Sequence, residues 1–219
     1  MTRTSAHPGL DAAILDYNGV LGLQPTPDQW QHLARTANWP DQDLAGFQDA
    51  VWNARPAYDA GQLSDMAYWA TVLGAHPGPC LLRQLRDADT EMWTTSDDRV
   101  LAVLERAHHS GLPLFLLSNA PLHLSDVLDA TDWCRRLVAR AFYSARLQTI
   151  KPDPAAYLQA LAATGARDPR RVLFVDDRAD NCRAAESLGL RTLHFTGRTT
   201  DLEAALLPTS GLIRLPEPP

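Results

Sequence analysis

Long apolar runs are missing from this chain of 219 residues, and cysteine is scarce. No stretch approaches the roughly 18 apolar residues that a membrane-spanning helix needs, and the opening segment, MTRTSAHPG, lacks the apolar run of a signal peptide. The three cysteines are widely spaced and never form a Cys-x-x-Cys pair, which is typical of free thiols in a reducing compartment. These absences predict a cytoplasmic protein with no membrane partner.

Basic residues are not in excess either. Lys and Arg number 20 against 26 Asp and Glu, which gives a formal net charge of -6. This balance argues against a nucleic-acid partner, because binding to the phosphate backbone favours a basic face. The hydrophobic content of 45% is ordinary for a globular protein. A chain of this length can form one sizeable core, or a core with a smaller insert, as a monomer or a homodimer.

Short apolar runs alternate with helix-like segments along much of the chain. This alternation predicts an α/β fold, built on a Rossmann-like parallel sheet with right-handed crossovers. The predicted strands are 12–15, 113–117, 141–143, 172–175 and 191–195. The predicted helices between them are 98–109, 121–137, 154–164 and 181–188.

Residues 24–95 break the alternation, because this region reads as helical throughout. It contains every Trp except Trp133, and aromatic residues at helical spacing indicate that it has its own core. Pro40, Pro56 and Gly61 are expected to divide it into about four helices. We therefore predict a core of residues 1–23 and 96–219, with residues 24–95 inserted as a helical cap that is well placed to be a lid.

Polar side chains follow the predicted strands at the points where they end. In parallel sheets, the chemistry gathers beyond the carboxyl ends of the strands. Each side chain alone has an ordinary explanation, such as a loop cap, a helix N-cap or a solvated lysine. Together they indicate a site, formed by Asp16, Ser118, Asn119, Asp176, Asp177 and, in a nearby loop, Lys151.

The charges of these residues suit phosphoryl chemistry. An aspartate can act as a covalent nucleophile, but its attack on a phosphoryl group brings two anions together, so positive charge is needed. Lys151 supplies one compact cation. Asp16, Asp176 and Asp177 would repel one another unless a metal ion lay among them, and hard oxygen ligands of this kind suit Mg²⁺. Ser118 and its neighbour can donate hydrogen bonds to phosphate oxygens.

In this order, the four motifs resemble those of the haloacid dehalogenase superfamily, whose members are mostly phosphatases. The motifs are DYNGV from Asp16, Ser118 with Asn119, KPDP from Lys151, and FVDDRADN from Phe174. The stretch YDAGQLSDMAYW, residues 58–69, is similar to the helical cap of the subfamily I members that carry their cap between the first two motifs. The fourth motif resembles that of small sugar-phosphate phosphatases in that subgroup.

The resemblance implies a role for each matching residue. Asp16 would be the nucleophile that forms an aspartyl-phosphate, and Ser118 and Lys151 would hold the transferring group, with Asn119 nearby. Mg²⁺ would be bound by Asp177 and Asp176, by Asp16 and by the main-chain carbonyl of Asn18. Asn181 would orient Lys151 or a metal ligand. The substrate would be a small phosphorylated metabolite.

Asn18 departs from the family pattern. Most phosphatases of the superfamily have a second Asp there, which protonates the leaving oxygen and later activates water. An amide does neither, and general acid–base help contributes about 10²–10⁴-fold to a rate. His123 or a residue of the cap could supply the missing acid. Two other readings stay open: a binding protein with impaired catalysis, and a 2-haloacid dehalogenase, although that reaction needs no metal.

The cap would select the substrate. Arg55, Trp52 and Tyr58 are the candidates for substrate contact in this region. Cys182 adjoins the acidic motif, and we interpret it as a small buried side chain rather than as a redox group.

Overall fold

A parallel five-stranded sheet lies at the centre of the computed structural model, which describes residues 9–207. Its strand order is β3-β2-β1-β4-β5, and every neighbouring pair runs parallel. The predicted α/β fold with a Rossmann-like sheet is therefore confirmed. The strands are β1 (Ala12–Leu15), β2 (Leu114–Ser118), β3 (Val138–Tyr143), β4 (Val172–Asp176) and β5 (Arg191–His194).

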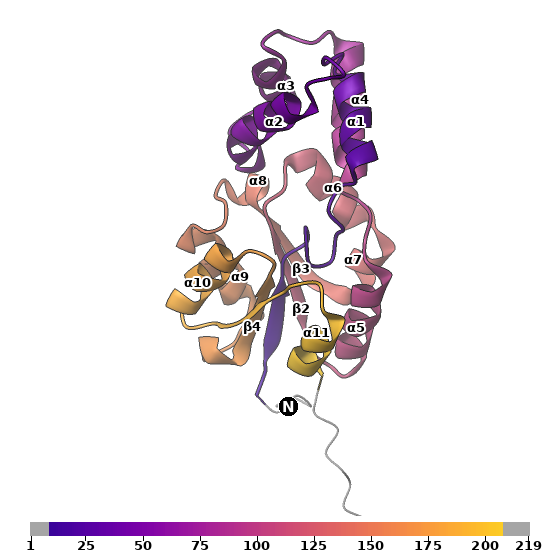
Figure 1. Ribbon diagram of the computed structural model, residues 1–219. Coiled ribbons are helices and arrows are strands. Elements are labelled where there is room, and N and C mark those ends of the chain that lie inside the picture. Colours follow the sequence, from indigo (N-terminus) through magenta and orange to yellow (C-terminus); the bar gives the residue numbers. More distant parts are fainter. Residues whose placement is uncertain (1–8, 208–219) are drawn as a thin grey trace, which may run out of the picture.

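Helices cover both faces of the sheet (Figure 1). Successive strand residues point to opposite faces, so Ile14 packs with the helices of one face and Leu15 with those of the other. A strand buried on both sides reads as a continuous apolar run, which is why these strands are visible in the sequence. One face carries α9 (Pro154–Thr164) and α10 (Ala179–Ser187), and the other carries α5 (Asp98–His109), α6 (Leu122–Ala130), α7 (Asp132–Leu137) and α11 (Thr199–Leu206).

The single helix predicted over residues 121–137 is wrong. Two helices, α6 and α7, meet at Thr131, whose extended backbone (φ -67°, ψ 149°) ends the first helix. The Thr131 hydroxyl accepts a hydrogen bond from the Cys134 amide and so caps the second helix. A hydroxyl at a helix start satisfies an otherwise unpaired N–H, which favours the break. Strand β3 then begins at Val138, three residues before its predicted start.

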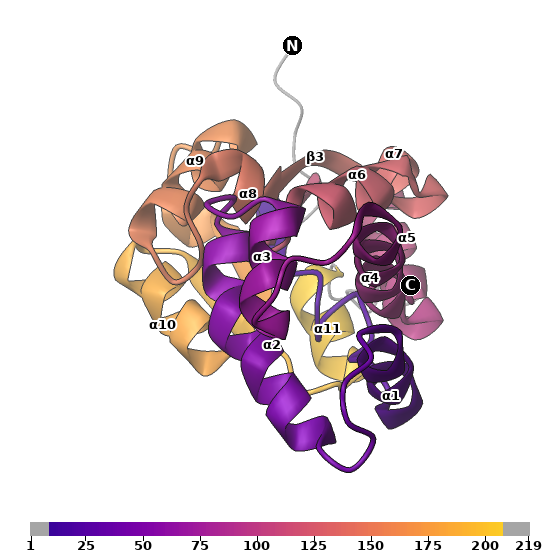
Figure 2. The ribbon, with the colours of Figure 1, turned by 90° about the horizontal axis from the view of Figure 1, so that it is seen from above.

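Four helices fill the region between β1 and α5, in agreement with the number expected. We call them the helical insert: α1 (Pro27–Thr36), α2 (Leu44–Asp59), α3 (Asp65–Leu73) and α4 (Pro79–Met92). They lie together at one end of the sheet (Figures 1 and 2). The division into domains at residues 24 and 95 stays a prediction, and residues 1–8 and 208–219 of the predicted core lie outside the described residues.

Pro56 does not break the insert as expected, because α2 continues through it to Asp59. Aromatic side chains pack inside the insert: the rings of Tyr58 and Tyr68 stack with their centroids 4.1 Å apart. Trp30 meets Phe47 edge to face at 6.5 Å. The insert thus has the aromatic core that its sequence indicated. Among the described residues, no helix is both long and apolar enough to span a membrane.

Candidate active site

The carboxyl ends of three neighbouring strands bring the predicted polar residues together. Asp16 directly follows β1, and its amide donates to the Val175 carbonyl of β4 at 2.8 Å. Ser118 is the last residue of β2, and Asp176 is the last residue of β4. The parallel pairing of β1 with both strands places all three ends on one edge of the sheet.

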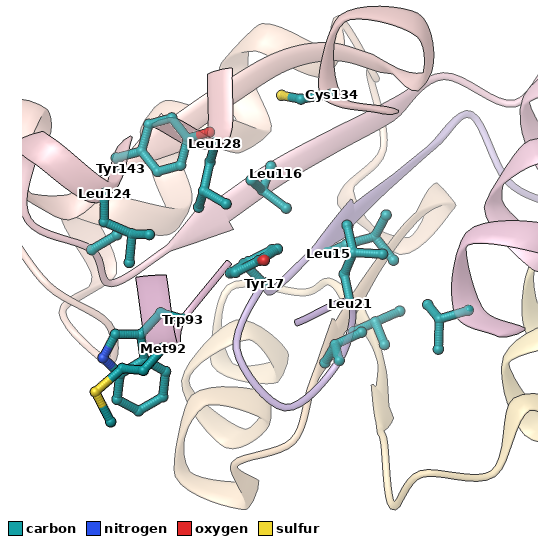
Figure 3. Close-up of a cluster of buried hydrophobic side chains, with 14 of the residues drawn as sticks. Leu15, Tyr17, Leu21, Met92, Trp93, Leu116, Leu124, Leu128, Cys134 and Tyr143 are labelled. Atoms are coloured by element: carbon teal, nitrogen blue, oxygen red, sulfur yellow. The ribbon is translucent and has the colours of Figure 1, made fainter. Parts of the chain in front are cut away.

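The turn after β1 is fixed by Tyr17. Its side chain is fully buried and stacks on Trp133, with the ring centroids 5.7 Å apart. Figure 3 shows Tyr17 within a cluster of apolar side chains that includes Leu15 and Leu116. The Tyr17 carbonyl accepts hydrogen bonds from the next amides along the turn, and the Tyr17 amide donates to Asp16 Oδ1 at 2.7 Å. This anchor holds Asp16 in one orientation.

Lys151 lies between two carboxylates. Its Nζ is 2.8 Å from Asp16 Oδ1 and 2.7 Å from Asp176 Oδ2, and all three side chains are buried. Burial alone would lower the pKa of Lys151, but the two carboxylates outweigh it and raise that pKa. Burial raises the pKa of Asp16 to about 7, against the opposing charge of Lys151 and with the support of Asp176. The predicted nucleophile and the predicted cation are therefore in direct contact.

The side chain of Asn119 binds the backbone of Lys151 through two hydrogen bonds. Its Nδ2 donates to the Lys151 carbonyl at 3.0 Å, and its Oδ1 accepts from the Lys151 amide at 2.9 Å. Both ends of the amide are thus used to fix the backbone of Lys151 beside β2. Asn119 also lines the cavity described below. Its clearest role in the structure is to position Lys151.

Asp176 is enclosed by donors. Asn181 Nδ2 lies 3.0 and 3.1 Å from its two oxygens, and the Arg178 amide donates to Oδ1 at 2.9 Å. Asn181 therefore contacts one of the predicted metal ligands directly, as its expected orienting role requires. Asp177 is only partly buried, and burial together with the charge of Asp176 raises its pKa.

The donor set fits a hard divalent cation. One carboxylate oxygen from each of Asp16, Asp176 and Asp177 lies within 4.8 Å of the others. Three carboxylates face one ammonium here, so the cluster carries excess negative charge that a cation would offset. Within residues 9–207, no donor hydrogen-bonds to the Asn18 main-chain carbonyl, the fourth ligand that the resemblance implies.

Three buried side-chain oxygens at the site have no partner in the described part of the chain. They are Ser118 Oγ, Asn18 Oδ1 and Asn181 Oδ1. A buried polar atom without a hydrogen bond is costly, which is typical of a group that waits for a ligand. Asn18 lines the cavity, whereas Ser118 is buried at the strand end and is not part of the cavity wall.

A cavity of about 470 Å³ lies between the sheet edge and the insert. Asp16, Lys151 and Asp177 line it from the sheet. The insert contributes four residues of α2 to its wall, which are Trp52, Arg55, Pro56 and Asp59, and Trp93 follows α4. The remaining wall is formed by Asn18, Gln24, Asn119, Ile150, Pro152, Arg178 and Asn181.

Of the three insert residues predicted to contact substrate, two line the cavity and one does not. Trp52 lines the cavity and is 48% exposed, so its ring is free to contact a ligand. Tyr58 does not line it, because it stacks on Tyr68 and donates to Asp65. Arg55 lines the cavity, but its guanidinium is already paired with two carboxylates of the insert, Asp59 and Asp89.

His123 and Cys182 lie apart from the cavity wall. His123 Nε2 is 3.8 Å from Asp87 Oδ1 of α4, and the side chain is not among the described residues that line the cavity. Cys182 is buried, as expected of a small apolar side chain, and burial raises the pKa of its thiol to about 11.

Sequence reasoning missed Asp59. Its carboxylate belongs to the cavity wall and accepts from Arg55 Nε at 2.8 Å. The available signal was the i, i+4 spacing of Arg55 and Asp59 on one helix, which indicates an ion pair but not that the pair faces the site.

A buried aspartate, a lysine and an acidic cluster lie together at the carboxyl edge of the parallel sheet, below the helical insert. This is the place where α/β enzymes have their active sites. The family model of haloacid dehalogenase-like hydrolases matches residues 5–189, and the chain belongs to this family.

Solved structures agree with this assignment. A HAD family enzyme from Bacteroides thetaiotaomicron, in complex with magnesium and inorganic phosphate, has a TM-score of 0.68 at 18% identity, covering 87% of this chain and 96% of that one. A predicted HAD-like family hydrolase from Porphyromonas gingivalis has a TM-score of 0.71 at 16% identity, covering 92% and 100%. The L-2-haloacid dehalogenase of Xanthobacter autotrophicus, with chloropropionic acid covalently bound, has a TM-score of 0.61 at 17% identity, covering 84% and 76%. These likenesses establish a shared fold.

Proposed function

We propose that this protein is a Mg²⁺-dependent phosphatase of a small phosphorylated metabolite and that it works through an aspartyl-phosphate at Asp16. One observation carries the proposal: Asp16 contacts Lys151 at 2.8 Å and lies in one cluster with two further carboxylates, Asp176 and Asp177. The magnesium and phosphate bound to the Bacteroides enzyme support the same chemistry.

In the proposed reaction, a carboxylate oxygen of Asp16 attacks phosphorus and the bond to the leaving oxygen breaks. Lys151 offsets the charge on the transferring group, and the Ser118 hydroxyl, buried at the end of β2 without a partner among the described residues, would donate a hydrogen bond to a phosphoryl oxygen that reaches it. Mg²⁺, held by Asp16, Asp176, Asp177 and the Asn18 carbonyl, would supply further positive charge for the phosphoryl oxygens. Asn119 positions Lys151, and Asn181 positions Asp176, each through hydrogen bonds.

The acidic cluster favours phosphoryl transfer over dehalogenation. A dehalogenase needs no cation at this edge, whereas three mutually close carboxylates, with one lysine between two of them, are stabilised by one. The insert would cover the cavity, exclude water and select a substrate small enough for about 470 Å³. Trp52 is the insert residue that we expect to contact the leaving group, and Arg55 would act mainly through its ion pairs. We further propose a cytoplasmic enzyme, monomeric or homodimeric, whose insert is a separate cap domain.

Phosphate release from a panel of phosphorylated metabolites tests the proposal. We expect turnover of at least one compound with Mg²⁺, no turnover with a chelator, and loss of activity in Asp16→Asn, because an amide cannot act as the nucleophile. Asp168→Asn is the matched control, since Asp168 only caps a short turn and pairs with Arg170.

Two results would contradict the proposal. A phosphorylated ligand that binds without turnover anywhere on the panel would point to a binding protein that has lost catalysis. Halide release from 2-chloropropionate that continues in the presence of a chelator would identify a dehalogenase.

A further inference from the structure

The cavity wall holds one carboxylic acid to which the proposed reaction gives no role. Of the described residues that line the cavity, three are carboxylic acids: Asp16, Asp59 and Asp177. The first is the proposed nucleophile and the third a proposed metal ligand. Asp59 is the carboxylic acid that has no role yet. The reaction still needs a group that donates and accepts a proton, because the amide of Asn18 does neither.

The location of Asp59 is fixed by the core as well as by the insert. It is the last residue of α2, and its main-chain carbonyl accepts a hydrogen bond from the Ser144 hydroxyl of α8 (Ser144–Leu147). The same hydroxyl oxygen accepts from the Ala120 amide at 2.9 Å, two residues beyond Ser118. A single side chain therefore joins Asp59 to the end of β2, next to the reacting centre.

Only one oxygen of the Asp59 carboxyl is occupied. Oδ1 accepts from Arg55 Nε at 2.8 Å, while Oδ2 has no hydrogen-bond partner within residues 9–207. The side chain keeps 13% exposure, and the residue belongs to the cavity wall. The carboxyl is thus oriented by an arginine and keeps a free oxygen for a ligand.

The surroundings of Asp59 suit proton exchange. Burial raises its pKa to about 6, because it outweighs the opposing charge of Arg55, and Asp89 of α4 adds to the rise. The other charged or titratable groups around it are Tyr68 of α3, whose pKa the Asp59 charge raises, and Lys151, Asp16, Asp177 and Arg178, which line the same cavity. A carboxyl with a pKa near the working pH is an effective proton donor and acceptor.

We propose that Asp59 is the catalytic acid and base that serves this site in place of Asn18. The inference rests on the proposed phosphatase function. In the first half-reaction, the Asp59 carboxyl gives its proton to the leaving oxygen as that oxygen takes the electron pair of its bond to phosphorus. In the second, the Asp59 carboxylate takes a proton from water, the water oxygen bonds to phosphorus, and the bond to Asp16 breaks to release phosphate.

A purely structural role for Asp59, as a partner of Arg55, predicts different kinetics. Losing a structural partner slows all substrates alike. Losing a proton donor slows substrates in proportion to how poor their leaving group is, because a good leaving group departs without a proton. The ratio of rates on two substrates separates the two roles, and it does not depend on how much of a variant is folded.

The experiment compares Asp59→Asn with Asp89→Asn on 2,4-dinitrophenyl phosphate and phenyl phosphate. Asp89 is the matched control, because it is the other carboxylate partner of Arg55, at 2.9 Å. We expect D59N to lower kcat/KM on phenyl phosphate by about 10²–10⁴-fold and on the dinitrophenyl ester by less than about tenfold. D89N should lower both by the same factor. D59N should also remove the fall in kcat/KM above the Asp59 pKa of about 6.

A second variant extends the test. Asn18→Asp in the D59N background should recover at least about tenfold of the loss on phenyl phosphate, because it restores a proton donor at the cavity. Equal losses of D59N on both esters, or no recovery with N18D, would overturn the role of Asp59 while leaving the phosphatase intact. A wild-type protein that hydrolyses neither ester, and that forms no phosphoenzyme with acetyl phosphate, would instead overturn the proposed function.

Discussion

Gly19 lies directly against the side chain of Asp177. Its φ of +81° lies in the left-handed region, and a Cβ built there would come 2.0 Å from Asp177 Oδ2. No side chain fits this space unless the carboxylate moves. The backbone of Gly19 in the first motif therefore limits where the Asp177 side chain of the fourth motif can lie.

Gly19→Ala is expected to weaken Mg²⁺ binding at least about tenfold, which corresponds to about 1.4 kcal/mol, because Asp177 is displaced. The left-handed backbone adds a cost of about 1–2 kcal/mol to stability. Mg²⁺ titration calorimetry and urea unfolding measure the two effects. Gly165→Ala is the control, since Gly165 has a φ of +68° and nothing within 4 Å. Equal Mg²⁺ affinity in both variants would contradict the prediction.

At the scale of elements, the insert meets the core where α2 ends. A Cβ at Gly61 would lie 2.5 Å from the Ala145 carbonyl of α8, and its φ of +71° is again left-handed. The turn after α2 therefore packs backbone against backbone, and this contact lies two residues beyond Asp59.

Gly61→Ala should push the insert away from α8. We expect it to lower stability by about 1–3 kcal/mol more than Gly74→Ala, because crowding a packed interface costs that much. Gly74 shares the left-handed backbone, with a φ of +68°, but has open space around it. Urea unfolding measures the difference, and G61A alone should raise KM on aryl phosphates. A similar loss in both variants would show that the interface is not tight.

The elements differ in how far they could be predicted from the sequence. Buried parallel strands such as β1 and β4 appear in the sequence as apolar runs followed by acidic residues, so both the sheet and the acidic cluster could be predicted. The break at Thr131 was missed because a threonine cap leaves the helical periodicity almost unchanged. Pro56 was misjudged, since α2 continues through it for one more turn, to Asp59. Asp59 was missed because its importance depends on the docking of the insert.

On the scale of the whole molecule, the buried carboxylates link stability to pH and metal. Because burial raises the pKa of Asp16 to about 7, the folded protein holds a proton that the unfolded chain releases near pH 4. The metal-free protein should therefore lose stability as the pH rises from about 4 to about 7. A bound Mg²⁺ would replace that proton.

Saturating Mg²⁺ is expected to raise Tm by about 5–10 °C at pH 8, and by clearly less at pH 5, where protons compete for the carboxylates. Thermal unfolding with Mg²⁺ or with a chelator at each pH gives the comparison. Asp177→Asn should show a smaller rise at pH 8, because it removes one oxygen ligand's charge. A rise that is the same at both pH values would refute the linkage.

The Ser144 hydroxyl has two possible acceptors, and this affects how the insert can separate from the core. A hydroxyl carries one hydrogen, and the Ser144 oxygen lies closer to the Asp59 carbonyl than to the Ala120 carbonyl, which is 3.5 Å away. If the insert withdraws, the hydrogen can turn to Ala120, so no buried donor is stranded at a cost of about 1–3 kcal/mol. The contact that holds the Asp59 carbonyl would therefore be exchangeable, and an insert that moved to admit substrate would break it at little cost.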